Sequence, residues 1–456
     1  MMKRANFDST QHISGEYSNI YENIKQKPAI EISEYLATLE LQATIGVLLC
    51  FTRAEQADIY SDFSNTIQLD IFNALKRREF SKVFIAMKSD DRVDFYQSLT
   101  AEQQASLLPF LDKATREDVY HLNLYDPECA GGIMSTDFAS IREQMTVSEA
   151  IEKVRRDSPS KKTIYYVYVV DSNKTLRGFV TLKDLILAKP EELVKNILHD
   201  DFAWANIYED QEIVAKKIEK YDLVAIPVLN NEMQLAGIVT HDDAIEIIRA
   251  EQTEDLEKLM GIIPDENEYT YSQTSAWGHF KKRVLWILSL AIMGLISGVI
   301  LHSYEEALES LIILALYMPM VADTGGNSGS QAATVVIRAL ALGDIKLSDW
   351  FKVIFKEARV GFMLSLCLGL VTLGKVSLLS NNAVLPEGFS LLQVGSVIAL
   401  ALSLQVIVST IIGATMPLIV KRLNGDPAVV ASPAITTIVD ITGMLIYFGT
   451  ATFFLF

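Results

Sequence analysis

The last hydrophobic stretch of the chain, residues 427–456, carries a single acidic side chain, Asp440, and no basic one. A carboxylate in the middle of a membrane-spanning helix costs about 2.5–3.5 kcal/mol even on insertion scales, so it should face protein or water rather than lipid. At helical spacing, Ser432, Thr436, Asp440 and Gly443 fall on one face. The spacing predicts a narrow polar face that could hold a hydrated cation. The alternative is an aspartate that a neighbouring helix neutralises.

A second polar string, DTGGNSGSQ at 323–331, lies inside the apolar segment 306–342. It offers oxygen ligands from Asp323, Asn327 and Gln331, with no His or Cys. Such a set disfavours zinc and copper and favours magnesium, calcium or manganese. Glycine-rich breaks at membrane depth are tolerated where the backbone is buried or lines a water-filled cavity. We therefore expect a broken helix beside an ion path, and a surface hairpin is the alternative.

The elements around these residues divide the chain by charge. The net charge is −17, and residues 1–280 hold 47 acidic and 29 basic side chains, whereas residues 281–456 hold 10 and 11. Residues 201–270 alone hold 17 acids and 5 bases. An acidic surface argues against nucleic acid as a partner and favours cations. The sequence thus predicts an acidic soluble part followed by a nearly neutral membrane part.

Hydropathy predicts five membrane spans, at roughly 284–302, 306–342, 349–378, 391–420 and 427–455. Basic residues gather in the loops on one side, whereas the opposite loops, 302–306 and 380–389, contain no Lys or Arg. By the positive-inside rule, residues 1–280 lie in the cytosol and the C-terminus lies outside the cell. The N-terminus shows no signal peptide, so we expect a multi-pass protein of the cell (inner) membrane. The three cysteines are far apart and predict no disulfide framework.

The soluble part changes character near residue 130. Up to Leu124, apolar residues recur at three- and four-residue spacing, which predicts a stack of short helices. There, Asp90, Asp91 and Asp94 cluster near a helix start, where aspartate ordinarily serves as a cap; contact with a regulatory cation is the alternative. From 131 to 250, a strand–turn–strand–helix pattern occurs twice with an offset of 59 residues, which indicates two copies of one α/β module.

Each copy carries the string G-x-V-T-x-x-D, at 178–184 and 237–243, and in this the segment resembles a tandem pair of CBS domains. Such pairs commonly bind adenine nucleotides in the cleft between modules. The resemblance implies an ATP site with Asp184 at the ribose, Lys183 near phosphate and Tyr166 near the base. The alternative is that Asp184 only caps the helix that it opens.

The whole order resembles the MgtE family of magnesium channels and transporters: a helical domain, a CBS pair, an acidic connecting helix, and spans with the strings P-x-x-x-D-T-G-G-N-x-G-S-Q and T-T-I-V-D-I-T-G. The resemblance implies a homodimer in the lipid bilayer with a pore on its two-fold axis. It places the pore carboxylate at Asp440 and a cytosolic mouth residue at Asp426. It places regulatory Mg²⁺ at Asp222, Asp243, Glu246, Glu251, Glu254 and Asp255.

This sequence departs from the family pattern at four positions in the pore, the regulatory site and the nucleotide site. Ser432 stands where the family has a pore-lining asparagine, and Glu246 stands where it has an aspartate. Lys183 replaces an arginine and Leu223 an aromatic residue beside the nucleotide.

The predicted fold is therefore a multidomain membrane protein. Its parts are a flexible lead-in at 1–27, an all-α domain at 28–130, the α/β CBS pair at 131–250, a connecting helix and linker at 251–280, and a bundle of five membrane helices at 281–456. We expect a magnesium channel or transporter for Mg²⁺ uptake that cytosolic Mg²⁺ closes. Its pore would be lined by Asp440, Asp323, Asn327, Ser432 and Thr436. The alternatives are an ion-coupled secondary transporter of divalent cations and a membrane-anchored nucleotide sensor. Without a P-loop, a nucleophile elbow or a histidine-rich site, the sequence does not predict an enzyme.

Overall fold

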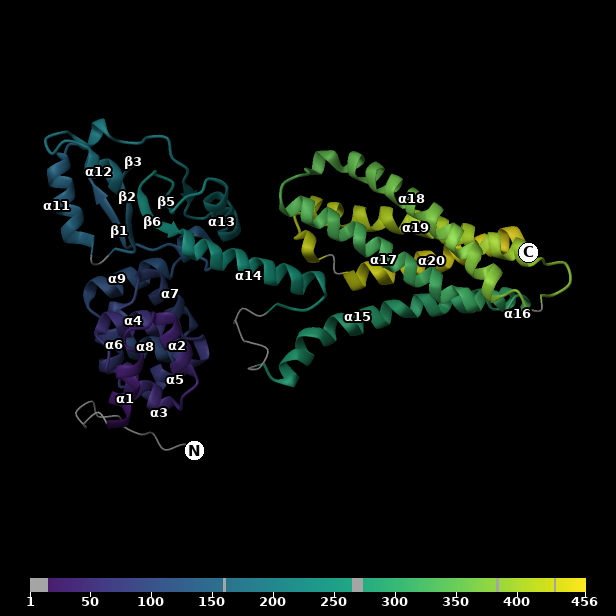
Figure 1. Cartoon of the computed structure of the whole chain (residues 1–456), viewed down its shortest axis with the longest axis horizontal. Coiled ribbons are helices and arrows are strands. Elements are labelled where there is room, and N and C mark those ends of the chain that lie inside the picture. The colour runs from purple at the N-terminus through teal and green to yellow at the C-terminus, as the bar shows by residue number, and fades with distance from the viewer. Residues whose placement is uncertain (1–14, 159–160, 265–273, 383–384, 430–431) are drawn as a thin grey trace. The chain divides into compact units, whose positions relative to one another are not determined.

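The computed structural model describes residues 15–158, 161–264, 274–382, 385–429 and 432–456. The chain forms two compact units, Met1–Glu251 and Gln252–Phe456. Figure 1 follows the chain from the small helices of the first unit to the long helices of the second. The predicted linker falls partly on 265–273, which lies outside the described residues.

The first unit begins with a domain of short helices around an aromatic core. Tyr60, Phe72, Phe80 and Phe95 pack edge to face or tilted, with ring centroids 4.9–5.6 Å apart. Helix α1 lies inside the segment 1–27 that we expected to be flexible, and Ile24 at its end is buried in this core. The helices are α1 (Gly15–Ile24), α2 (Ala29–Ala37), α3 (Leu41–Leu48), α4 (Arg53–Ser61), α5 (Asn65–Ala74), α6 (Arg77–Ala86), α7 (Ser89–Ser98), α8 (Ala101–Leu107), η1 (Leu108–Phe110), α9 (Lys113–Leu122) and α10 (Ala130–Ile133).

The sequence repeat folds into two three-stranded sheets of the same topology, each with one parallel and one antiparallel strand pair. The 59-residue offset is kept in register, since Val169 pairs with Gly178 in one sheet and Val228 with Gly237 in the other. The predicted pair of α/β modules is therefore confirmed. The elements are β1 (Phe138–Ile141), α11 (Val147–Asp157), β2 (Thr163–Val170), β3 (Leu176–Thr181), α12 (Leu182–Leu187), η3 (Val194–Asn196), β4 (Ala205–Asn206), α13 (Gln211–Lys220), β5 (Ala225–Leu229) and β6 (Leu235–Thr240).

The last helix of the second module continues as the charged connecting helix, so that α14 (His241–Leu259) is one element. Gly261, with φ +70°, accepts the left-handed backbone that ends the helix. Ile262 N–H donates to the Glu257 carbonyl at 2.9 Å, as in a glycine-terminated helix end.

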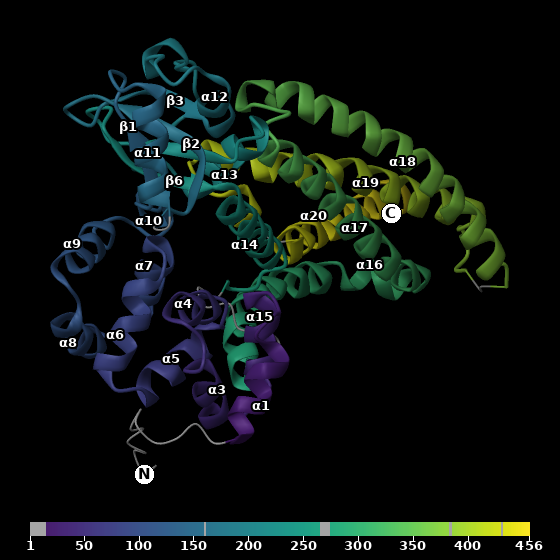
Figure 2. The ribbon, with the colours of Figure 1, turned by 60° about the vertical axis from the view of Figure 1, so that its left-hand side comes forward.

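The second unit is a bundle of long helices around α19, which packs against α17, α18 and α20 and contributes the most buried apolar residues. Figure 2 shows α19 between α18 on one side and α17 with α20 on the other. Helix α15 packs on α20. The helices are α15 (Ala276–Ser303), α16 (Glu305–Ser310), α17 (Ile313–Ala341), η4 (Leu347–Asp349), α18 (Trp350–Leu379), α19 (Leu391–Arg422), η5 (Pro427–Val429) and α20 (Ser432–Leu455).

Among the described residues, four helical segments are long and apolar enough to cross a membrane: Ala276–Ser303, Leu347–Leu379, Leu391–Arg422 and Ser432–Leu455. Helix α17 has 29 residues but carries the polar string in its middle. The fifth span therefore stays a prediction. The expected break at 323–331 is wrong, because α17 runs through the string as a continuous helix that begins only at Ile313.

Candidate ion pathway and ion-sensing acids

Helices α17 and α20 bring together the polar residues that the sequence singled out. Ser432 Oγ donates to Ser330 Oγ at 3.0 Å, and Ser330 Oγ lies 3.4 Å from Thr436 Oγ1. Ser330 is three residues after Asn327 and seven after Asp323, so these three share a face of α17. Two polar faces, one from each helix, thus lie side by side.

Asp440 lies at the end of this pair of faces and is partly open within its own chain. Its Oδ1 lies 3.8 Å from where a side chain on Gly326 would begin. Asp323 and Asn327 are exposed in the single chain. Asp323 and Asn327 are therefore open on the face of α17, and Asp440 is partly open on the face of α20.

Glycine in the string serves close helix packing rather than a break. A Cβ on Gly326 would lie 2.8 Å from Thr436 Cγ2, and one on Gly413 would lie 2.0 Å from the Gly329 carbonyl oxygen. Small residues let membrane helices approach until their backbones touch. This explains why a Gly-rich string inside an apolar segment can stay helical, contrary to the sequence expectation.

Sequence reasoning missed Gln405, a fully buried amide in the middle of α19. Its Nε2 donates to the Val439 carbonyl at 3.0 Å, one residue before Asp440. Added Cβ atoms on Gly325 and Gly443 would lie 2.2 and 2.3 Å from that nitrogen. The amide therefore fixes α20 against α17 and α19. Its signal in the sequence was a polar residue within the apolar run 394–420.

The predicted mouth residue, Asp426, is held by a lysine of α14. Lys258 Nζ lies 3.0 Å from Asp426 Oδ2 and 2.8 Å from Glu254 Oε1. Burial opposes the charge, but these two carboxylates raise the pKa of Lys258 above its ordinary value. Asp426 Oδ1 also accepts from Ala428 N–H at 2.9 Å, so this carboxylate caps the short helix η5 as well.

In the first unit, Asp243 is paired with Lys162, whose Nζ lies 2.7 and 2.8 Å from its two oxygens. Asp222 is an exposed turn residue with φ +50° after α13. Glu251 Oε1 accepts from Gln211 Nε2 at 2.8 Å. Glu246 and Asp255, also predicted from the resemblance, lie on α14. Within the described residues, no three His, Cys, Asp or Glu side chains are placed to hold a metal ion.

The acids near the start of α7 do not cap it. The residue before the helix is Lys88, whose side chain makes no capping hydrogen bond, and the first N–H of the helix, that of Ser89, donates to Asp137 Oδ2 at 2.9 Å. Asp90 instead pairs with Lys162. Burial and the nearby Asp90 raise the pKa of Asp91 to about 6. The surrounding protein and the neighbouring aspartates raise the pKa of Asp94 to about 7, although the residue itself is exposed to solvent.

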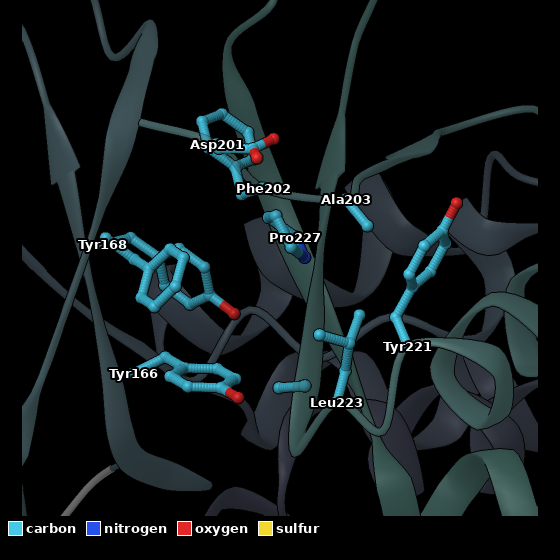
Figure 3. Close-up of a pocket in the computed structure, with 10 residues that line it drawn as sticks. Tyr166, Tyr168, Asp201, Phe202, Ala203, Tyr221, Leu223 and Pro227 are labelled. Carbon is cyan, nitrogen blue, oxygen red and sulfur yellow. The ribbon is translucent and has the colours of Figure 1, made fainter. Parts of the chain in front are cut away.

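The cleft between the two repeats holds a cavity of about 390 Å³. Figure 3 shows the rings of Tyr166 and Tyr168 from β2 on one side and Leu223 and Pro227 of the second repeat on the other. The other lining residues are Phe179, Asp201, Phe202, Ala203, Tyr221 and Ala225. The walls are thus mostly aromatic and apolar, which suits a flat ring system.

Of the three predicted nucleotide residues, Tyr166 lines this cavity, whereas Lys183 and Asp184 are not among the lining residues. Asp184 Oδ2 accepts from the Thr181 hydroxyl at 2.6 Å and lies 2.9 Å from His199 Nε2. Burial opposes ionisation, but these hydrogen bonds lower the pKa of Asp184. The capping box at Thr181 is complete, so the helix-capping alternative describes Asp184 in this structure.

Known proteins match nearly the whole chain. A family model described as divalent cation transporter (MgtE) matches residues 318–450, the MgtE intracellular N domain matches 27–128, and CBS domains match 130–191 and 194–250. The magnesium transporter MgtE of Thermus thermophilus is 36% identical over 409 residues, covering 89% of this chain and 88% of the relative. That of Bacillus subtilis is 33% identical and covers 87% and 85%. A crystal structure of the cytosolic domain of the Mg²⁺ channel MgtE with ATP aligns at a TM-score of 0.49, with 31% identity, over 51% of this chain and 95% of that one.

Proposed function

The chain belongs to the MgtE family of magnesium transporters, and we propose that it carries Mg²⁺ across the cell membrane along the polar faces of α17 and α20. One observation carries the proposal. The partly exposed carboxylate of Asp440 lies at the end of a polar face continued by Thr436 and Ser432, which lie against Ser330 of α17. A carboxylate at membrane depth that is left open to solvent or a partner chain marks an ion path.

We propose that two copies of the chain form the path as a homodimer. In one chain, Asp323 and Asn327 are exposed and Asp440 is partly exposed on these polar faces. Two Asp440 carboxylates would match the charge of one divalent cation. Because Mg²⁺ gives up its water reluctantly, Ser432, Thr436 and Asn327 would hold its water shell rather than the metal. A hydrated ion held this way is bound weakly enough to leave.

We further propose that cytosolic Mg²⁺ closes the path by binding the acids of α14 and the mouth residue. Mutual repulsion among these acids favours separation, and a bridging divalent cation would reverse it. Moving such an equilibrium from 1:99 to 99:1 takes about 5.5 kcal/mol of differential binding, so several ions must act together. The proposed residues are Asp222, Glu246, Glu251, Glu254, Asp255 and Asp426. Of these, Glu254 and Asp426 share Lys258, from which a divalent cation would have to take them; Asp243, also implied by the resemblance, is paired with Lys162.

The orientation follows from the loops, with residues 1–280 in the cytosol and the C-terminus outside.

The aromatic cavity between the repeats supports a finer proposal, that ATP binds there with its base on Tyr166. Tyr166→Ala should then weaken ATP binding by about tenfold, in line with the 1–3 kcal/mol typical of base stacking. Tyr165→Ala is the matched control, because Tyr165 is exposed and does not line the cavity. Equal ATP affinity of both variants and the wild type would refute the proposal that the base stacks on Tyr166.

Magnesium uptake by proteoliposomes containing the full chain tests the transport proposal. Asp440→Ala and Asp440→Asn should both abolish Mg²⁺ uptake, since each removes the charge that attracts the ion. Asp344→Asn is the control, because Asp344 is an exposed acid of the same unit outside the polar faces. Undiminished uptake by Asp440→Ala would refute the assignment.

A further inference from the structure

A buried lysine joins two acids that come from different parts of the soluble unit. Lys162 precedes β2, and its side chain is only 5% exposed. Its Nζ donates to both oxygens of Asp243, at 2.7 and 2.8 Å, and to Asp90. Asp90 lies in the first turn of α7 in the helical domain, whereas Asp243 lies in the first turn of α14. One ammonium group therefore connects the helical domain with both repeats of the CBS pair.

The surroundings make this ammonium necessary. Asp91, Asp94 and Asp242 are further acidic side chains close by, and Lys88 is a second cationic side chain that acts on Asp91 and Asp242. Asp90 is 5% exposed, and its Oδ1 has no hydrogen-bond partner in the described part of the chain. Without Lys162, the buried Asp90 carboxylate and the partly buried Asp243 carboxylate would lie close together with no cation between them, which is the costly way to break an ion pair that is shielded from water.

The same junction is closed by hydrogen bonds that need no ion. Ser89 N–H donates to Asp137 Oδ2 at 2.9 Å, and the Ser89 and Ser135 hydroxyls lie 2.9 Å apart. Thr136 Oγ1 donates to Asp118 Oδ1 at 2.9 Å. These contacts join α7 and α9 to the segment that leads into β1. The junction therefore contains direct protein–protein hydrogen bonds in addition to the Lys162 ion pairs.

We propose that Lys162 is a positioning residue that docks the helical domain on the CBS pair without Mg²⁺. An ammonium fixed between Asp90 and Asp243 supplies the positive charge that a bridging divalent ion would otherwise bring. Magnesium regulation then acts on the α14 acids and Asp426 and not at this junction. This last step rests on the proposed function, whereas the docking itself does not.

The distance between the helical domain and the CBS pair tests the proposal directly in the full chain. One label is placed on each domain by replacing exposed Glu102 of the helical domain and exposed Asn173 of the CBS pair with cysteine, in a chain without the native cysteines. The distance between the two spin or fluorescence labels is then compared in EDTA and in millimolar Mg²⁺. The wild type should stay docked in both. Lys162→Met should raise the ratio of undocked to docked molecules in EDTA by at least about tenfold, as expected for a broken buried pair. Added Mg²⁺ should restore docking, because the freed carboxylates can then bridge the ion.

Three variants distinguish loss of the Lys162 charge from a general loss of folding. Lys161→Met, the neighbouring lysine, should behave as the wild type, and Lys162→Arg should retain docking in EDTA. Asp90→Asn combined with Lys162→Met removes one of the opposing charges, so it should dock better in EDTA than Lys162→Met alone. A wild type that opens in EDTA would overturn the proposal whatever the variants do, and so would a Lys162→Met protein that stays docked there. Because no transport is measured, failure of the pore assignment leaves this result unaffected.

Discussion

The contact between Gly413 of α19 and Gly329 of α17 gives the most quantitative prediction. A Cβ on Gly413 would lie 2.0 Å from the Gly329 carbonyl oxygen and 2.7 Å from its carbon. Carbon and oxygen atoms in contact normally lie about 3.3 Å apart or more, so Gly413→Ala must push the helices apart by roughly 1.3 Å. Such overpacking typically costs about 1–3 kcal/mol. We expect a clear loss of stability. The added Cβ is fixed to its own backbone and the atoms that it meets are backbone atoms, so neither side of the contact can rotate away.

Thermal unfolding of the purified chain in detergent measures this loss. About 1–3 kcal/mol in a unit of this size corresponds to a midpoint lower by roughly 2–12 °C. Gly374→Ala is the matched control, since a Cβ there would meet nothing within 4 Å. If Gly413→Ala and Gly374→Ala unfold at the same temperature, the close packing of α17 on α19 is refuted, and with it the explanation of the unbroken helix.

Three further perturbations test other parts of the structure. At alkaline pH, Gln405→Glu should destabilise the membrane unit much more than Gln405→Leu, because an ionised buried carboxylate facing the Val439 carbonyl has no donor to offer; equal unfolding midpoints there would contradict this. The raised pKa values of Asp91 and Asp94, about 6 and about 7, mean that the folded state binds these protons more tightly than the unfolded chain. The contribution of these two groups to stability should therefore be largest below about pH 4 and be lost as pH rises to about 7, and Asp94→Asn should flatten this part of the pH dependence in thermal unfolding. Neutralising Glu254 and Asp255 together should leave Mg²⁺ uptake insensitive to Mg²⁺ on the side of the soluble unit, and retained inhibition would exclude these two acids as sensors.

Patterns that repeat were readable from the sequence. The 59-residue offset predicted two modules, and the structure keeps it in the pairing of Val169 with Gly178 and of Val228 with Gly237. The 3.6-residue period placed Ser432, Thr436 and Asp440 on one face of α20. Periodicity reports which face a residue occupies because regular elements fix side-chain direction.

Contacts between distant segments were not readable. The Gly-rich string predicted a break, because the sequence does not show that Gly413 of α19 meets it closely. Likewise, Asp90 was taken for a cap, since nothing local reveals that Lys162, 72 residues further on, lies beside it. The role of Gln405 becomes visible only when the fold places its amide against the Val439 carbonyl. Each case depends on a partner that only the fold supplies.

The most direct test of the central claim is whether water and Mg²⁺ reach the α20 face. Single cysteines are placed at Thr436 on the polar face and at Val439 on the buried face, in a chain without its native cysteines, and Mg²⁺ uptake is followed after treatment with a water-soluble thiol reagent. An ion path along Thr436 and Asp440 predicts that the reagent blocks uptake by Thr436→Cys, that Mg²⁺ slows this block, and that Val439→Cys is unaffected. Uptake that continues in fully labelled Thr436→Cys protein would contradict the path.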